Sequence, residues 1–175
     1  MTPEQRRAAF ALVLLPGGRR RLSPEEFADE LGQPPREWAL DQLLDAIARQ
    51  DGEDAEAALV VSGSFGRDRR WTRPYVELLE SDWHLLHEQA AQALGELGGA
   101  DAVPALVGAA HRVPAYLAHD EGRALAVKAV HSLGRIPGPE AEAALRDLLE
   151  HEDHELRVRV RRVLDRRLAD PPGPR

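Results

Sequence analysis

The residues best suited to chemistry are His84, His87 and Glu88, which lie in the segment 83–88. Positions three apart on a helix share a face, and two imidazoles with a carboxylate suit zinc or iron. At the start of an amphipathic helix, the same residues more commonly supply caps, hydrogen bonds and packing contacts. We therefore expect no metal or other cofactor and no catalysis, and a metal-dependent enzyme is the alternative.

A second group combines cations with an aromatic ring, because Arg67, Arg69, Arg70 and Arg73 flank Trp71. Such a mixture can hold nucleic acid through phosphate contacts and base stacking. The chain as a whole has a formal net charge of −7, which repels a phosphate backbone. Nucleic acid is therefore disfavoured as a partner, and an enzyme acting on nucleic acid through this group stays a second alternative.

The elements that must position these residues are helices arranged in a repeat. The segment 94–98 recurs 39 residues later at 133–136, and the same offset relates 105–106 to 144–145. Each unit has a helix with apolar residues three and four apart, a glycine stop and a second, shorter helix, which is the pattern of an αα-hairpin. A period of about 40 suits HEAT-like arrays, in which stacked hairpins bury a face that none can bury alone.

The segment 87–98, with Ala102 and Leu106, resembles the HEAT-like repeat of phycobilisome lyases, and the likeness covers about 83–168. The segments 82–88 and 114–121 further resemble uncharacterised bacterial HEAT-repeat proteins, some of which look like immunity proteins of toxin systems. The resemblance implies an all-α fold, a short α-solenoid of helical hairpins. It also implies a non-catalytic scaffold whose groove binds another protein, as an immunity or adaptor protein does.

Some proteins with this kind of repeat are enzymes. Deoxyhypusine hydroxylases bind two irons through His-Glu pairs at equivalent helix starts. In this chain the 39-residue offset maps His87 and Glu88 onto Ala126 and Val127, which cannot bind iron. The sequence therefore lacks the ligands that a two-iron centre requires.

The chain is predicted to form a single domain over 1–170, with degenerate helices over 1–81 and clear repeats over 82–168. Thr2 and Ser23 each provide a hydroxyl cap, followed by proline and, three residues after the cap, by Gln or Glu. An apolar stripe that begins at His154 predicts a terminal cap helix, and the proline-rich tail 170–175 is expected to be disordered. Apolar spacing places the N-terminal helices at about 3–14, 24–31, 36–49, 53–61 and 74–81, with breaks at 32, 52 and 63–66.

The segment from Arg112 to Asp120 lengthens the spacing between the units by about eight residues. Insertions in repeat proteins often emerge on the binding face, so we expect a partner to bind there. An acidic chain suits a basic partner. The equally open alternative is that Tyr116 and Leu117 only plug the end of a hairpin. The candidate partner-binding residues are Trp83, His84, His87, Tyr116, His119, Asp120 and Glu121.

The composition and motifs of the chain exclude several kinds of site and of protein. The chain has no cysteine, which excludes disulfides, thiolate zinc sites and cysteine nucleophiles, and a reducing cytoplasm fits best. No segment approaches the ~18 consecutive apolar residues of a membrane span. The chain also lacks a phosphate-binding loop, a nucleophile elbow and a dinucleotide-binding fingerprint.

Overall fold

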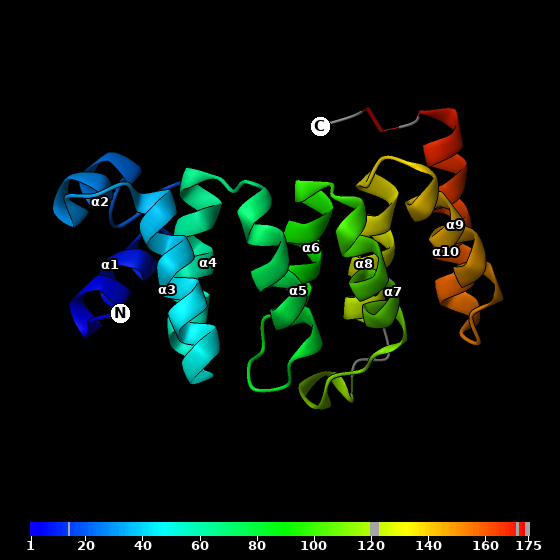
Figure 1. Cartoon of the computed structure of the whole chain (residues 1–175), viewed down its shortest axis with the longest axis horizontal. Coiled ribbons are helices and arrows are strands. Elements are labelled where there is room, and N and C mark those ends of the chain that lie inside the picture. Colours follow the sequence, from blue (N-terminus) through cyan, green and yellow to red (C-terminus); the bar gives the residue numbers. More distant parts are fainter. Residues whose placement is uncertain (14, 120–122, 171, 174–175) are drawn as a thin grey trace. The chain divides into compact units, whose positions relative to one another are not determined.

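The described residues fold into helices joined by turns and loops (Figure 1). The computed structural model describes residues 1–13, 15–119, 123–170, 172 and 173. Within these residues the only β pairing is an isolated bridge between Leu15 and Arg19. The prediction of an all-α fold of helical hairpins is confirmed. None of the described helices has both the length and the apolar character needed to cross a membrane.

The chain divides into two compact units, Met1–Pro74 and Tyr75–Arg175. The boundary lies close to position 81, where the sequence predicts a change from degenerate helices to clear repeats. The prediction of a single domain over 1–170 stays a prediction, as does disorder of the tail 170–175, of which residues 171, 174 and 175 lie outside the described residues.

The first unit is a hairpin with additional helices packed on it. Both predicted capping boxes, at Thr2 and Ser23, are present. Helices α3 and α4 form the hairpin, and α1 packs on α4 and contacts α2. The elements of this unit are α1 (Pro3–Ala11), α2 (Pro24–Leu31), α3 (Pro35–Arg49), α4 (Gly52–Phe65), the short 3-10 helix η1 (Arg69–Trp71) and the start of α5 (Thr72–Glu80).

Two predicted helix ends in this unit are wrong. Helix α1 ends at Ala11 rather than at 14, because the carbonyl of Ala11 accepts hydrogen bonds from the amides of Arg21 and Leu22 as the chain turns back. Helix α4 continues to Phe65 rather than ending at 61, so Gly63 lies inside the helix. The Phe65 ring packs 5.8 Å from that of Phe27, and this tertiary contact offsets the cost of a helical glycine.

A buried carboxylate ties α1 to the α3–α4 hairpin. Asp54 is 1% exposed and accepts hydrogen bonds from the amino group of Met1 (2.8 Å), from Nε of Arg6 (2.8 Å) and from Nη2 of Arg49 (2.7 Å). Burial opposes ionisation of Asp54, but these three cationic donors outweigh it and lower the pKa of Asp54 below its usual value. The first unit is therefore held together by a charged cluster.

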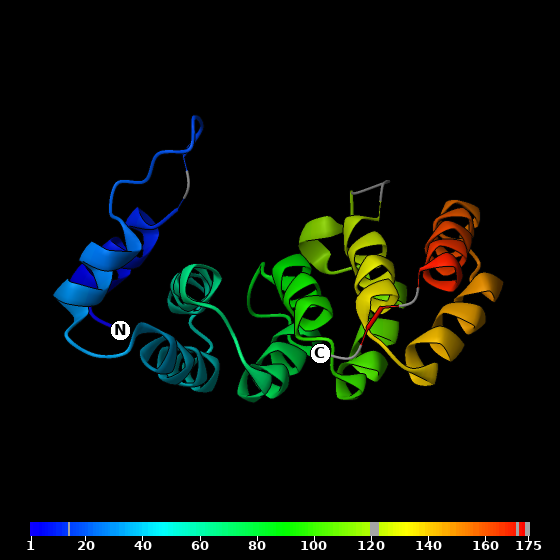
Figure 2. The same cartoon turned by 90° about the horizontal axis from the view of Figure 1, so that it is seen from above.

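The second unit consists of two hairpins and a terminal helix. Helices α6 and α7 follow each other as one pair and α8 and α9 as the next. Helix α8 contacts α6, α7, α9 and α10; α6, α8 and α10 lie side by side in one layer, with α7 and α9 in the other (Figure 2). Leu94, Leu106, Leu133 and Leu145 are fully buried, as predicted stacking requires. The helices after α5 are α6 (His87–Leu97), α7 (Val103–His111), α8 (Ala124–Arg135), α9 (Pro139–Asp147) and α10 (His154–Ala169), with 3-10 helices η2 (Ala100–Ala102), η3 (Ala115–Leu117) and η4 (Leu148–Glu150).

Two glycines at equivalent repeat positions bring these helices close together. A Cβ atom on Gly95 of α6 would lie 2.7 Å from Cα of Ser132 on α8, which is too close for any side chain. A Cβ atom on Gly134 of α8 would collide with the Val163 side chain of α10. The predicted glycine stop is a different residue, Gly98, which ends α6 with a φ of 74°. The repeated glycines therefore set the spacing of the α6–α8–α10 layer.

A buried arginine fixes α10 to the end of α8. Arg167 is 6% exposed, and its guanidinium donates to the carbonyl oxygens of Ile136 and Gly138, the latter at 2.7 Å. The last carbonyls of a helix have no partner within the helix and need donors from elsewhere. Nη1 of Arg167 also reaches the carbonyl oxygens of Leu133 and Gly134 in the last turn of α8, at 3.5 and 3.4 Å, which makes α10 part of the folded unit.

Candidate functional site

The predicted site residue His84 lies inside the protein, in the loop between α5 and α6. Its side chain is 4% exposed. Its Nε2 atom lies 2.8 Å from the carbonyl oxygen of Leu78, and its Nδ1 atom accepts a hydrogen bond from the amide of Leu86 at 2.9 Å. Both ring nitrogens are therefore engaged with the backbone, and the imidazole joins the last turn of α5 to the loop before α6.

His87 has a similar structural role. It is 1% exposed, its Nε2 atom lies 2.7 Å from the carbonyl oxygen of Ser81, and its Nδ1 atom lies 3.3 Å from the hydroxyl of Tyr116. A metal ion at His84 and His87 would have to displace these hydrogen bonds. Over the described residues, no group of three or more histidine or acidic side chains is placed to hold a metal ion.

The electrostatics of this pair favour neutral rings. Burial lowers the pKa of His84 to about 4, and the neighbouring His87 acts in the same direction. Burial also lowers the pKa of His87, against the opposing effect of its hydrogen bond to Ser81. Neutral imidazoles at pH 7 can each donate one hydrogen bond and accept another, which is the pattern observed.

The other predicted contacts lie in several environments. Trp83 is half-buried and meets the His84 ring edge-on at 4.7 Å, while Tyr116 is 38% exposed and His119 is exposed. Asp120 and Glu121 lie outside the described residues. The structure thus brings Trp83, His84, His87 and Tyr116 together. Their contact with a partner stays a prediction, and a direct contact with either imidazole would require this cluster to open.

The arginine group around Trp71 lacks an accessible aromatic face. Trp71 is fully buried, so its indole cannot stack on a base as the nucleic-acid alternative requires. Arg70 pairs with Asp68 at 2.6 Å and with Glu37 at 3.4 Å. These contacts give the cluster a structural role within the first unit.

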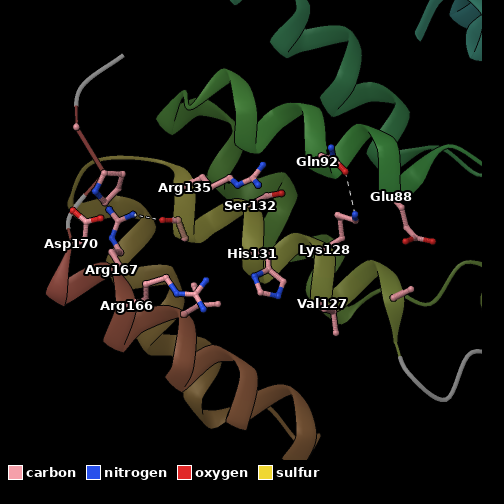
Figure 3. Close-up of a pocket in the computed structure, with 15 residues that line it drawn as sticks. Glu88, Gln92, Val127, Lys128, His131, Ser132, Arg135, Arg166, Arg167 and Asp170 are labelled. Carbon is pink, nitrogen blue, oxygen red and sulfur yellow. Dashed lines mark hydrogen bonds between the residues drawn. The ribbon is translucent and has the colours of Figure 1, made fainter. Parts of the chain in front are cut away.

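The second unit contains a groove that the sequence analysis did not predict. It has a volume of about 780 Å³ and runs along α6, α8 and α10 (Figure 3). We refer to it as the basic groove. Its lining residues are Glu88, Gln92, Ala124, Val127, Lys128, His131, Ser132, Gly134, Arg135, Val163, Arg166, Arg167, Asp170, Pro172 and Gly173.

Positive charge is concentrated around this groove. Its lining contains four Lys or Arg residues, Lys128, Arg135, Arg166 and Arg167, and two acidic ones, Glu88 and Asp170, although the whole chain is acidic. His131 lies among these cations: its pKa is lowered by partial burial and then by Arg159, Arg166, Arg135 and Lys128. The formal charge of the lining is therefore opposite in sign to the net charge of the chain.

The cations on α8 are only weakly neutralised. Nζ of Lys128 donates to the uncharged amide oxygen of Gln92 at 3.1 Å. Nη1 of Arg135 lies 4.0 Å from Oε1 of Glu96, and both side chains are exposed enough for water to weaken that pair. Positive charge thus stays available to a ligand in the groove.

Comparison with known proteins bears on the helices that form this groove. Residues 86–111, which comprise α6 and α7, match the sequence model of the PBS lyase HEAT-like repeat family. The chain contains a HEAT-like repeat. No curated protein and no solved structure matches it. The matched repeat provides α6, and the hairpin related to it by the 39-residue offset provides α8.

A signal for the basic groove was present in the sequence. Lys128, His131 and Arg135 follow one another at spacings of three and four, so they share one face of a helix. The segment 124–135 contains no acidic residue, and six arginines lie on the terminal helix 154–169. The net charge of the whole chain does not reveal this pattern, because acidic residues elsewhere in the chain outnumber these cations.

Proposed function

We propose that this HEAT-like repeat chain is a non-catalytic scaffold that binds another protein through the basic groove. The observation that carries this proposal is the groove itself, a cavity of about 780 Å³ along three helices of one unit. Its helices are held at fixed spacing by the glycine contacts at Gly95 and Gly134 and by the buried Arg167. A fixed set of helices loses little conformational freedom when a partner binds.

The side chains considered for chemistry support binding better than catalysis. His84 and His87 use their ring nitrogens to hold the loop between α5 and α6, and Trp71 is buried. An adaptor or immunity protein requires only a surface that recognises its target. The metal-dependent and nucleic-acid enzymes therefore rank below the scaffold.

The test is affinity capture with a charge-reversed groove. Lys128→Glu and Arg135→Glu together reverse two lining residues, and Arg20→Glu with Arg21→Glu makes the same change in net charge at exposed positions of the first unit. We expect a protein captured by the unaltered chain and by the control to be lost with the groove variant. Calorimetry with that protein in purified form should give a defined stoichiometry.

The proposal has clear failing outcomes. It is wrong if every captured protein also binds the groove variant with unchanged affinity, or if no purified candidate forms a stoichiometric complex. Circular dichroism and thermal unfolding of each variant separate loss of binding from loss of fold. Retention of the complex by a milder variant, Lys128→Gln with Arg135→Gln, at reduced affinity would support a role for charge.

A further inference from the structure

The basic groove also indicates what kind of segment it binds. We propose that it receives a short acidic, extended segment of the partner protein, an inference that rests on the proposed function. The earlier expectation of a basic partner comes from the net charge of the whole chain. A binding site responds chiefly to the charges within a Debye length of about 8 Å, and in the groove these are mostly positive.

The spacing of the cations fits an extended chain. Lys128 and Arg135 are seven residues apart on α8, which corresponds to about 10 Å along a helix. Extended peptide rises about 3.3 Å per residue, so a run of about four residues covers that distance. His131 lies between the two on the same face, and Arg166 of α10 borders the same groove (Figure 3). Two carboxylates three residues apart in such a run are separated by about 10 Å and could therefore each meet a cation.

The floor of the groove also suits a peptide. Val127 and Ala124 are half-buried and line it, and Lys128 keeps its ammonium group directed to Gln92. Apolar atoms beside cations allow a partner to bury an aliphatic side chain while its carboxylates pair with the rim. An acidic run next to an apolar residue matches both features.

A nucleic acid fits these features less well. Among the described lining residues none is Phe, Tyr or Trp, so a base has no aromatic ring on which to stack. Glu88 and Asp170 also line the groove and would repel a continuous line of phosphates. Beyond the groove, the net charge of −7 opposes a long polyanion. A short acidic segment carries only a few charges, so it can pair with the cations without extending to Glu88, Asp170 or the acidic surface beyond the groove.

The experiment uses a synthetic twelve-residue peptide with a central Glu-Leu-Glu-Glu run and the same peptide with glutamines in place of its glutamates. Binding to the full chain is measured by fluorescence anisotropy at low and at moderate salt, and amide chemical shifts of isotope-labelled protein locate the site. We expect shifts in α8 and α10, binding at least tenfold weaker for the glutamine peptide, and weakening by salt. The Lys128→Glu and Arg135→Glu variant should lose at least tenfold in affinity, and the Arg20→Glu and Arg21→Glu control should not.

The inference is overturned if the acidic peptide does not bind, if it binds the groove variant equally well, or if its shifts fall outside α8 and α10. A twelve-base-pair DNA duplex is the competing ligand. Tighter binding of the duplex through the same residues would replace the acidic segment with nucleic acid. Failure of the peptide together with groove-dependent capture of a protein would overturn this inference alone, whereas capture that ignores the groove would overturn the proposed function.

Discussion

The two units of the chain join their helices by different means. In the first unit, Asp54 gathers three cationic groups, and the Phe27 ring packs against those of Trp38 and Phe65. In the second unit, glycines at equivalent positions bring successive helices together. Helix contacts that recur in successive repeats produce a periodic sequence pattern. A single charged cluster such as that of Asp54 produces no such pattern. This difference explains why the repeat is visible only in the second half of the chain.

The two units should also differ in their response to acid. Asp54 has a pKa below its usual value of 3.8, so its contribution is complete above that value and is lost as pH falls further. His84 has a pKa lowered to about 4, so the folded second unit binds fewer protons than the unfolded chain between about pH 6.5 and 4. The second unit should therefore begin to weaken at a higher pH than the first.

The largest effect is expected from Asp54→Ala. Removal of the carboxylate leaves three cationic groups without their shared partner and should lower the free energy of unfolding by about 3 to 4 kcal/mol. Denaturant unfolding, with hydrogen exchange to assign the change, should place the loss in the first unit. Asp45→Ala is the matched control, because Asp45 is exposed and also pairs with Arg49. If both variants lower the free energy of unfolding equally, Asp54 does not have this central role in the first unit.

A smaller loss is expected from Gly95→Ala. The added methyl group meets the backbone of Ser132, and overpacking of this kind costs about 1 to 3 kcal/mol. Gly108→Ala is the control, because Gly108 is in α7 with no atom within 4 Å of an added Cβ, and the change should stabilise by about 0.5 to 1 kcal/mol. If chemical denaturation shows that Gly95→Ala lowers the free energy of unfolding and Gly108→Ala raises it, Gly95 is confirmed as a packing residue. Stabilisation by both would refute the close contact.

Arg167→Met tests the link between α10 and α8. It removes the donors for the carbonyls of Ile136 and Gly138 and should cost about 2 kcal/mol. Hydrogen exchange should show faster exchange in α10. Arg166→Met, at the exposed neighbouring position, should change stability little. If the two variants are equally stable, α10 is held by its apolar stripe alone.

The smallest expected effect is a change in the pH dependence of stability. In the unaltered chain, the free energy of unfolding of the second unit should fall as pH decreases from about 6.5 to 4, because the unfolded chain binds a proton that buried His84 does not. His84→Asn should reduce that slope, even if it also lowers stability at pH 7. His119→Asn, at an exposed position, is the control. An unchanged slope in the first variant would exclude His84 as its source.

Local patterns predicted the elements well where local interactions form them. The capping boxes at Thr2 and Ser23 involve residues three apart, so the sequence contains both partners of each hydrogen bond. The ends of α1 and α4 were misplaced because their partners, Leu22 and Phe27, are distant in sequence. Helix ends that depend on tertiary contacts are not predictable from a short window.

The candidate site shows the same limit. The structure places Trp83, His84, His87 and Tyr116 in one neighbourhood, although the lengthened segment follows α7 and not α6, and the use of these residues as a binding face stays a prediction. The expected role in hydrogen bonding and packing holds for both imidazoles, but the sequence did not identify their partners, which are carbonyls six residues earlier in the chain. It also missed the basic groove, since that requires knowing that α8 and α10 lie side by side.

By itself, the sequence determined that this protein is all-α and contains a HEAT-like repeat, because helical periodicity and the 39-residue offset are properties of the order of residues. Only the tertiary structure decided which charges gather. Lys128 and Arg166 are 38 residues apart, and their shared groove depends on how closely Gly134 lets α10 approach α8. Charge interactions depend on distance in space, and the packing of the helices sets that distance.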